Sequence, residues 1–365
     1  MARRFASLLL ALALLLAAGP AAAETMIRIA VVEGASSLIV RAPGLRMRAL
    51  TDDGFYEPVP GDAVRLERRG GGVALGGAAP VDAVKLRADG PITVGEKTVR
   101  GAVEVVADEG GLLAVNELPM ESYLAAVLGS EMPPSFEPEA LKAQAVAART
   151  YAIGKKIAAE GAAYHLGSTV LAQVYGGVHR EDPRTKAAVA ATEGEVLVFD
   201  HMPIEAYFFS SCGGRTEGGA EALGRPLPYL TVHACPERAD TPGARWSLTL
   251  SATDLGRRLG LGPVLDLSVE TRTASDRART VEVRTAKGRR RFTAVQLRQR
   301  IGYGALKSLA FEVDERGGRF HFHGRGAGHA AGLCQWGAQA AAQDGSAYRE
   351  ILGRYYPGVE IRRMY

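Results

Sequence analysis

The sequence predicts an α+β protein with an antiparallel β-rich N-terminal region, a core with two central helices and a small inserted α/β subdomain. Three observations support this prediction. Short β-rich segments, punctuated by glycine, proline and aspartate, fill residues 26–115. Two alanine-rich helical segments follow, separated by Pro133-Pro134. Further strand-like segments and a last alanine-rich segment complete the chain.

Residues 1–23 have the layout of a secretory signal peptide. Two arginines precede a short apolar run and a small-residue A-x-A ending, so we expect cleavage after Ala23. No later stretch reaches the roughly 20 apolar residues that a membrane span needs. We therefore expect export to the periplasm or the extracellular cell-wall space, with no membrane span after cleavage. A retained signal anchor is the alternative interpretation.

The rest of the chain is expected in four further parts: a β-rich region (24–112), a core (113–240), a small subdomain (241–312) and a C-terminal part of the core with a Gly/His loop and a helix (313–365). Strands are predicted in residues 165–235 at LAQVYGG, GEVLVFD, IEAYFFSSCGG and YLTVHAC, with a short helix at KAAVAATE. In the subdomain, SLTLSATDLGRRLGL predicts a strand and a helix capped by Ser251 and Asp254.

The charge balance gives no support for nucleic-acid binding. The chain has 44 basic and 40 acidic residues and a formal net charge of +4, of which the two leader arginines are part. One basic cluster surrounds the predicted turn at Lys287-Gly288 and contains Arg284, Lys287, Arg289, Arg290 and Arg291. We favour a solvated hairpin rim for this cluster, and contact with an anionic wall polymer is the alternative.

The two central helices carry the first candidate functional residues. Pro119 is expected to open the first helix and Pro138 the second, which continues to about Gly161. Because the second helix is small and apolar nearly all round, it is expected to be buried. Lys142, Gln144 and Arg149 lie within it. Lys142 and Arg149 either pair with carboxylates such as Glu131 or Glu139, or line a polar cleft.

Glu131 is the candidate catalytic residue. It lies near the C-terminal end of the first helix, beside Met132 and close to Phe136. The helix dipole and burial both raise a carboxyl pKa there, which suits a general acid for glycosidic bond cleavage. Hydrolysis usually needs a second carboxylate. Glu121 and Glu139 are candidates, although each also suits an ordinary helix position.

Three cysteines and three clustered histidines raise the question of a disulfide or a metal site. Cys212 and Cys235 flank a glycine-rich segment, so we predict a disulfide between them, with free thiols and a metal site as alternatives. No C-x-x-C or H-x-x-x-H spacing supports zinc. His321 and His323 alternate as in a strand, whereas His329 lies in a glycine-rich loop. No metal site and no cofactor are therefore predicted.

The block NELPMESYLAAVLGSEMPPSFEPEALKAQAVAARTYA resembles the signature of the SpoIID/LytB family, named after stage II sporulation protein D and the amidase enhancer LytB. The resemblance covers roughly residues 95–365. Later blocks follow in the family order: LAQVYGG, AYFFSSCGGRTEG, PYLTVHAC, LKSLAFEV and GRGAGHAAGLCQWGAQAAAQDG. The family loop commonly reads G-H-G-x-G-M-S-Q, from which this chain departs at Ala330 and Cys334.

The resemblance implies a lytic transglycosylase that cuts peptidoglycan glycan strands lacking stem peptides. In such an enzyme the C6 hydroxyl of N-acetylmuramic acid attacks C1, so one carboxyl suffices as acid and base. The glutamate of the family's S-E-M-P block falls on Glu131. The expected substrate-binding residues are Lys142, Gln144, Arg149, Tyr151, Tyr175, His329, Gln335 and Trp336. Tyr175, Tyr207 and Trp336 either stack on sugar rings or simply pack in the protein.

The expected partners are glycan strands and an N-acetylmuramoyl-L-alanine amidase. The alternative function is a non-catalytic amidase enhancer that binds glycan or the amidase. Retention of the S-E-M-P block around Glu131 favours the enzyme. Some family members bind zinc through a histidine and two nearby cysteines, but the cysteines here are far apart in sequence, so zinc is not carried over.

Overall fold

The structure is a computed structural model that describes residues 24–365, apart from 51–53, 170–171, 239–240 and 242. Its helices and mainly antiparallel sheets confirm the α+β class. The expected signal peptide, residues 1–23, lies outside the described residues. Within the described part of the chain, no helix combines the length and the apolar character that a membrane crossing requires.

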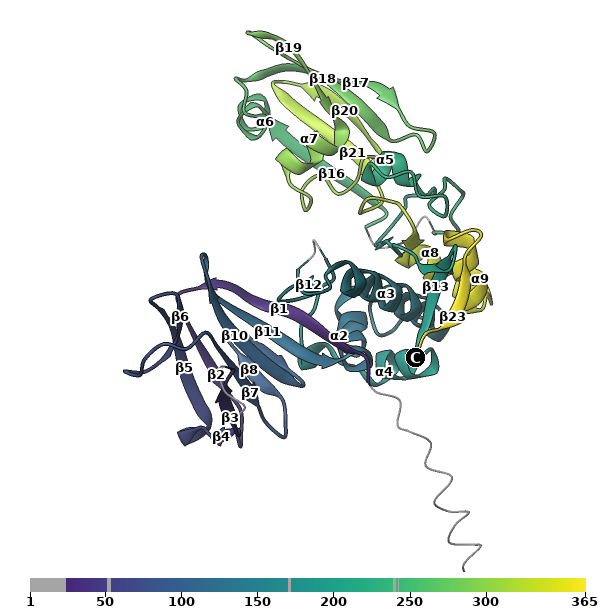
Figure 1. The fold of residues 1–365 in the computed structure, drawn as a ribbon. Helices are drawn as coiled ribbons and strands as arrows, with labels where there is room; N and C mark the ends of the chain where they lie inside the picture. Colours follow the sequence, from purple (N-terminus) through teal and green to yellow (C-terminus); the bar gives the residue numbers. More distant parts are fainter. Residues whose placement is uncertain (1–23, 51–53, 170–171, 239–240, 242) are drawn as a thin grey trace, which may run out of the picture.

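Two sheets form the N-terminal region (Figure 1). The larger has the order β12-β1-β11-β10-β7-β3-β4 and the smaller has the order β6-β5-β2-β8-β9. Their strands are β1 (Met26–Ala35), β2 (Ser37–Arg41), β3 (Arg46–Ala49), β4 (Glu57–Pro58), β5 (Ala63–Arg69), β6 (Gly72–Leu75), β7 (Ala83–Arg87), β8 (Ile92–Val94), β9 (Lys97–Val99), β10 (Ala102–Asp108), β11 (Gly111–Pro119) and β12 (Leu166–Gly167). The β-rich segments predicted for residues 26–115 are confirmed as strands.

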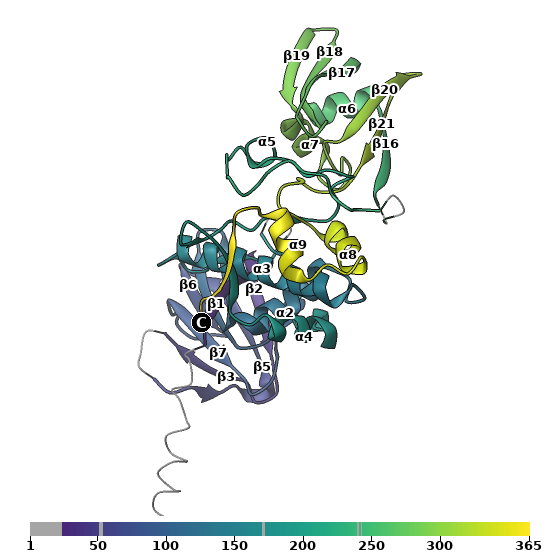
Figure 2. The same ribbon diagram turned by 90° about the vertical axis from the view of Figure 1, so that its right-hand side faces the viewer.

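Five helices surround the centre of the molecule: α2 (Met120–Glu131), α3 (Pro138–Ala158), α4 (Pro183–Ala191), α8 (Gln335–Gln343) and α9 (Tyr348–Tyr355). α3 packs against the other four, and Figure 2 shows α8 and α9 beside it. Every side chain of α3 between Ala143 and Ile153 is buried. The predicted buried helix is therefore confirmed, and its many alanines let neighbouring helices approach closely.

Two predicted strands, LAQVYGG and YLTVHAC, are wrong. Residues 172–177 join no sheet, and two of their backbone N–H groups donate to side chains instead: Val174 to Glu131 and Gly176 to Ser130. In YLTVHAC, the His233 N–H donates to the Thr216 hydroxyl. Of IEAYFFSSCGG, only β15 (Phe208–Phe209) is a strand, parallel to β22 (Leu333–Cys334). GEVLVFD forms β13 (Glu195–Phe199), between β14 (Met202–Pro203) and β23 (Glu360–Arg363).

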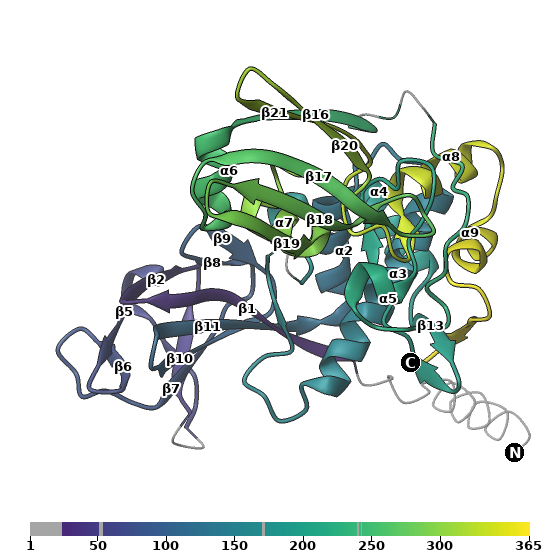
Figure 3. The same ribbon diagram turned by 90° about the horizontal axis from the view of Figure 1, so that it is seen from above.

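A subdomain stands above the helices in Figure 1, and Figure 3 shows its β17, β18 and β19 side by side. It contains β16 (Arg245–Ser251), α6 (Ala252–Leu259), β17 (Val264–Arg272), β18 (Ala278–Thr285), β19 (Gly288–Thr293), α7 (Ala294–Ile301), β20 (Phe311–Arg316) and β21 (Arg319–Arg325). Ser251 caps α6 as predicted, whereas α7 was not expected. Short helices elsewhere are α5 (Gly219–Leu223), η1 (Pro60–Asp62) and η2 (Val178–Arg180).

The buried apolar residues form two principal cores. One runs without interruption from the N-terminal sheets through the central helices. The other lies within the subdomain and extends from Trp246 to Phe322. The predicted boundary between residues 312 and 313 falls inside β20. Because β20 and β21 both contribute buried residues to the second core, that core extends past this boundary.

Candidate active site around Glu131

Glu131 is the last residue of α2. The helix ends there because Met132 is extended, with φ −130° and ψ 146°, and Pro133 and Pro134 follow. The N–H of Met132 donates to the carbonyl of Leu128 and closes the last helical turn. The carboxyl of Glu131 therefore lies at the negative end of the helix dipole, which disfavours its charged form.

The surroundings of Glu131 raise the pKa of its carboxyl above the ordinary value. Burial is the larger cause, and it is opposed by a hydrogen bond of 2.7 Å from the N–H of Val174 to Oε1. That donor belongs to the segment 172–177, which passes over the end of α2. The sequence analysis predicted a raised pKa for Glu131, and in the structure burial of the carboxyl is the main cause of that shift.

A pocket of about 500 Å³ opens beside Glu131, between the central core and the subdomain. Its walls are formed by Glu131, Tyr151, Ala172, Val174, Tyr207, Phe208, Phe209, Ser210, Leu223, Arg298, Tyr303, Lys307, Ala327, Gly328, His329 and Gln335. Most of these side chains are aromatic or polar, as expected for a groove that binds sugar rings. Among the described lining residues, Glu131 is the only carboxylate.

Three of the expected substrate-binding residues, Tyr151, His329 and Gln335, line this pocket. Tyr151 comes from α3, and burial raises the pKa of its hydroxyl to about 12, so the phenol stays protonated and can donate a hydrogen bond. Its ring meets the ring of Tyr207 edge-on, with centroids 5.8 Å apart. Gln335 is the first residue of α8.

His329 is neutral in this environment. Its Nδ1 accepts a hydrogen bond from the N–H of Ala331 at 3.2 Å, so the proton belongs on Nε2, which donates to the carbonyl of Phe208 at 3.1 Å. Burial lowers the pKa of His329 to about 4. Because both ring nitrogens are engaged, His329 is suited to hold the loop in place and to offer a ring face, and is poorly suited to proton transfer.

Three expected residues on α3 lie outside the pocket lining. The fully buried Arg149 forms a bidentate ion pair with Glu121, at 2.9 and 2.6 Å. Lys142 pairs with Glu139 at 2.6 Å. The paired interpretation therefore fits both cations, although Glu121 is a partner that the sequence did not suggest for Arg149. Gln144 is fully buried, and its amide atoms have no hydrogen-bond partner within the described part of the chain.

Tyr175 and Trp336 do not line the pocket either. Tyr175 is 2% exposed, and its hydroxyl donates to Asn116 Oδ1 at 2.9 Å. The ring of Trp336 packs edge-on against Phe136, with centroids 4.7 Å apart. Of the aromatic residues considered for stacking, only Tyr207 reaches the pocket.

Neither Glu121 nor Glu139, the candidates for a second catalytic carboxylate, lines the pocket beside Glu131. Glu121 is held by Arg149 and by the hydroxyl of Tyr365, which donates to it at 2.6 Å. Glu139 accepts from Lys142 and from the backbone N–H of Tyr348. Both carboxylates have structural partners, which matches the ordinary helix role left open for them.

The subdomain contributes residues that sequence reasoning missed. Arg298, Tyr303 and Lys307 line the pocket opposite Glu131's helix, from α7 and the loop that follows it. The guanidinium of Arg298 stacks on the Tyr303 ring at 4.9 Å and donates to the carbonyls of Leu306 and Lys307. The family-like block LKSLAFEV contains Lys307 and was the available signal. The basic hairpin is elsewhere, and three of its arginines pair with carboxylates of β17 and β18.

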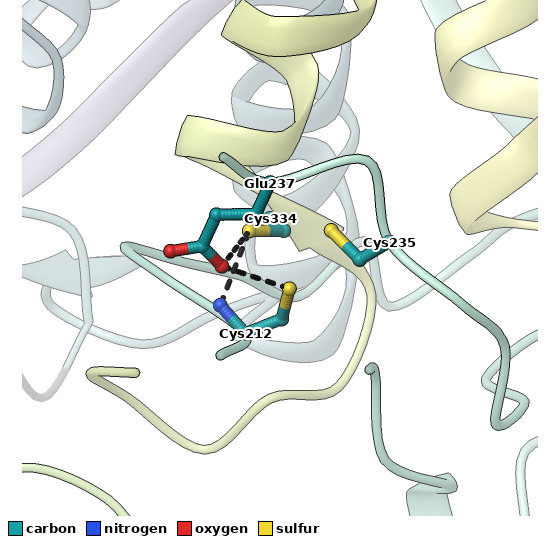
Figure 4. Close-up of side chains that lie close together, drawn as sticks. All are labelled: Cys212, Cys235, Glu237 and Cys334. Atoms are coloured by element: carbon teal, nitrogen blue, oxygen red, sulfur yellow. Dashed lines mark hydrogen bonds between the residues drawn. The ribbon is translucent and has the colours of Figure 1, made fainter. Parts of the chain in front are cut away.

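The predicted Cys212–Cys235 disulfide is not formed, and all three cysteines are free thiols. The pairing of β15 with β22 brings Cys334 next to Cys212, although 122 residues separate them. Cys212, Cys235, Cys334 and Glu237 place their ligand atoms within 4.8 Å of one another (Figure 4). Spacing in the sequence missed this cluster because its members come from three distant segments.

Comparison with known proteins assigns the family. A model described as stage II sporulation protein matches residues 108–199. Stage II sporulation protein D of Bacillus amyloliquefaciens is 32% identical over 263 residues, covering 68% of this chain and 75% of the relative. The protein of the same name from Bacillus subtilis is 30% identical over 292 residues, covering 74% and 82%. The amidase enhancer of Bacillus subtilis is 32% identical over 289 residues, covering 65% of this chain and 40% of the relative. The chain therefore belongs to the SpoIID/LytB family, whose members include stage II sporulation protein D.

Proposed function

We propose that this protein is a peptidoglycan lytic transglycosylase that uses Glu131 as its single acid and base. Membership of the SpoIID/LytB family relates the chain to cell-wall processes. One observation carries the finer proposal: a carboxyl with a raised pKa is the only described acidic residue in the lining of a pocket with aromatic and basic walls. A single acid suits a reaction in which the substrate supplies its own nucleophile.

The reaction balances with Glu131 alone. The protonated carboxyl transfers its proton to the glycosidic oxygen, and the bond from that oxygen to C1 of N-acetylmuramic acid breaks. The C6 hydroxyl of the same sugar attacks C1 and gives its proton to the carboxylate of Glu131. The products are a 1,6-anhydro end and a new free hydroxyl on the other fragment. No water is consumed, so no second carboxylate is required.

The other pocket residues have roles that follow from their chemistry. The rings of Tyr151 and Tyr207 offer faces and hydroxyls to sugars. N-Acetylmuramic acid carries a lactyl carboxylate, for which Lys307 and Arg298 are the cations in the pocket lining. Burial favours the protonated form of Glu131, and its hydrogen bond with Val174 supports the carboxylate that forms after the first proton transfer.

The test is a digest of purified glycan, with and without stem peptides, by the wild-type protein, by Glu131→Gln and by Glu139→Gln. Glu139 is a matched control because it follows in the next helix but lies outside the pocket lining. Mass spectrometry is expected to find 1,6-anhydro ends with wild type and with Glu139→Gln, and none with Glu131→Gln. Activity should fall as the pH rises above the raised pKa of Glu131, because its acidic form is lost.

Two other outcomes would replace the proposal. Reducing ends in place of anhydro ends would show hydrolysis. Binding of glycan, or of an N-acetylmuramoyl-L-alanine amidase, without any cleavage by wild type would favour the amidase-enhancer alternative, which the similarity to the Bacillus subtilis amidase enhancer keeps in view.

A further inference from the structure

We propose that Cys212, Cys235, Cys334 and Glu237 form a four-coordinate zinc site that ties together the loops behind the Glu131 pocket. The four side chains converge from three separate segments, and Figure 4 shows them pointing toward one another. This set contains no histidine and differs from the histidine with two neighbouring cysteines that the family resemblance implies for some members. It is independent of the proposed glycan cleavage.

The geometry is close to that of a tetrahedral zinc site. Zinc–sulfur bonds of about 2.3 Å place tetrahedral ligand atoms about 3.8 Å apart. The ligand atoms here all lie within 4.8 Å of one another. Cys212 Sγ is 2.9 Å and Cys334 Sγ is 3.8 Å from Glu237 Oε2. Small side-chain movements therefore suffice to bring all four onto one ion, which would replace the thiol protons as it binds.

The surroundings of the cluster suit sulfur that carries negative charge. Backbone N–H groups donate to two of the sulfurs at 3.2 to 3.4 Å. The N–H of Gly214 donates to Cys212 Sγ, and the N–H groups of Cys212 and Gly337 donate to Cys334 Sγ. The hydroxyl of Tyr355 lies 3.1 Å from Cys235 Sγ. Such outer contacts orient ligands and support the charge of thiolates bound to metal.

The carboxylate and the nearby charge are also held in place. Ser211 donates its hydroxyl to Glu237 Oε1, and the N–H of Gly213 donates to Oε2 at 2.9 Å. The buried guanidinium of Arg277 donates to the carbonyls of Cys212 and Arg215 at 2.6 and 2.8 Å. This cation offsets part of the excess negative charge that three thiolates and one carboxylate leave around a divalent ion.

The donor set selects the metal by its chemistry. Three thiolates exclude Mg²⁺ and Ca²⁺, which prefer oxygen ligands, and the carboxylate disfavours Cu⁺. Cys212 and Cys334 are 1% and 0% exposed, so the site has the closed character of structural zinc. Glycine is required beside it, because a Cβ on Gly337 would lie 2.4 Å from Cys235 Sγ and 2.1 Å from the Tyr355 hydroxyl.

The position of the cluster gives the ion a structural role. Cys334 precedes Gln335, and Cys212 lies two residues after Ser210, so two ligands adjoin residues of the pocket lining. Ser211 also forms an isolated antiparallel β-bridge with Ala327, which lines the pocket. A bound zinc ion would hold these loops at fixed separation. It would act on the pocket only by positioning its walls.

The first test uses the untagged protein, purified under reducing conditions, with zinc measured by mass spectrometry and thiols counted after unfolding in EDTA. The expected result is one zinc and three reactive thiols per chain, and a fall in melting temperature of at least about 5 °C when EDTA removes the metal. One reactive thiol without zinc would show a disulfide and overturn the proposal. Three reactive thiols without zinc, even after incubation with ZnCl₂, would also overturn it.

The second test assigns the ligands. Cys235→Ser and Glu237→Gln are each expected to weaken zinc binding, the cysteine variant by more than about 100-fold. His323→Ala is the control, because His323 is exposed on β21 and should leave binding unchanged. If the variants do not fold, Co²⁺ added to the wild-type apoprotein should produce strong thiolate-to-cobalt absorption in the near ultraviolet. Absence of that absorption from folded, reduced protein would overturn the proposal.

Discussion

The N–H of Val174 donates to Oε1 of Glu131 at 2.7 Å, so the candidate acid is held by a segment 43 residues further along the chain. This contact joins the end of a buried helix to a backbone that belongs to no sheet. Burial raises the pKa of the carboxyl, while the hydrogen bond keeps the carboxylate accessible as a second state. A group that must give and then take a proton needs both conditions.

Glu131→Gln is expected to stabilise the protein at neutral pH. The folded state raises the pKa of Glu131 above its ordinary 4.5, so in the pH window above 4.5 the folded protein binds more protons than the unfolded chain. Stability is therefore lost as the pH rises through this window, at about 1.4 kcal/mol for each unit of pKa difference. Glutamine has no such cost, and its Oε1 can still accept from Val174.

Melting temperatures of wild type and Glu131→Gln, measured from pH 4 to pH 8, check this prediction. The two should agree at the acid end and diverge as the pH rises, with the variant more stable. Curves that stay parallel across the whole range would contradict the raised pKa.

Glu121→Gln is expected to destabilise the protein by about 3–5 kcal/mol, because it leaves the guanidinium of Arg149 without its counter-ion in a fully buried position. Asp314→Asn is the matched control. Its partner Arg316 is 79% exposed at the side chain, so the loss should be no more than about 1 kcal/mol. Urea unfolding measures both, and similar losses for the two variants would show that burial of the Arg149 pair is not important.

Gly129→Ala is expected to displace the segment that holds the carboxyl of Glu131. A Cβ at Gly129 would lie 1.9 Å from the carbonyl oxygen of Arg180, so the segment packed on α2 must shift and the Val174 donor with it. Gly353→Ala is the control, because Gly353 is also helical but has no atom within 4 Å of the added carbon. It should be neutral or stabilise by up to about 1 kcal/mol.

Glycan cleavage and the melting temperature of both glycine variants are the measurements. We expect Gly129→Ala to lower both the rate of glycan cleavage and the melting temperature. Gly353→Ala should lower neither. Full activity in Gly129→Ala would show that the segment 172–180 does not position the acid.

Lys307→Glu is expected to raise KM for glycan about tenfold with a smaller effect on kcat, because it replaces a pocket cation with an anion facing an anionic substrate. Lys287→Glu is the control on the exposed hairpin turn of the basic cluster. Steady-state kinetics on soluble glycan separate the two sites. An equal rise in KM for Lys287→Glu would instead support contact between the hairpin and the wall polymer.

Local patterns in the sequence were sufficient to predict several elements of the structure. The prolines at 119, 133, 134 and 138 bound the two central helices, because proline cannot continue a helix but suits its first turn. Uniformly small residues predicted that α3 is buried. LAQVYGG resembles a strand in composition, yet its amide groups bond to Glu131 and Ser130, and composition cannot reveal such partners.

The sequence by itself determined the α+β class, the family resemblance and the candidate acid, since each depends on residues that are neighbours along the chain. Only the tertiary structure decided that Arg149 pairs with Glu121, that Arg298 and Lys307 reach the pocket, and that three distant cysteines meet at Glu237. Arg149 and Glu121 are 28 residues apart in the sequence, and Cys212 and Cys334 are 122 apart. These contacts follow from how buried helices and paired strands pack, which residue spacing does not encode.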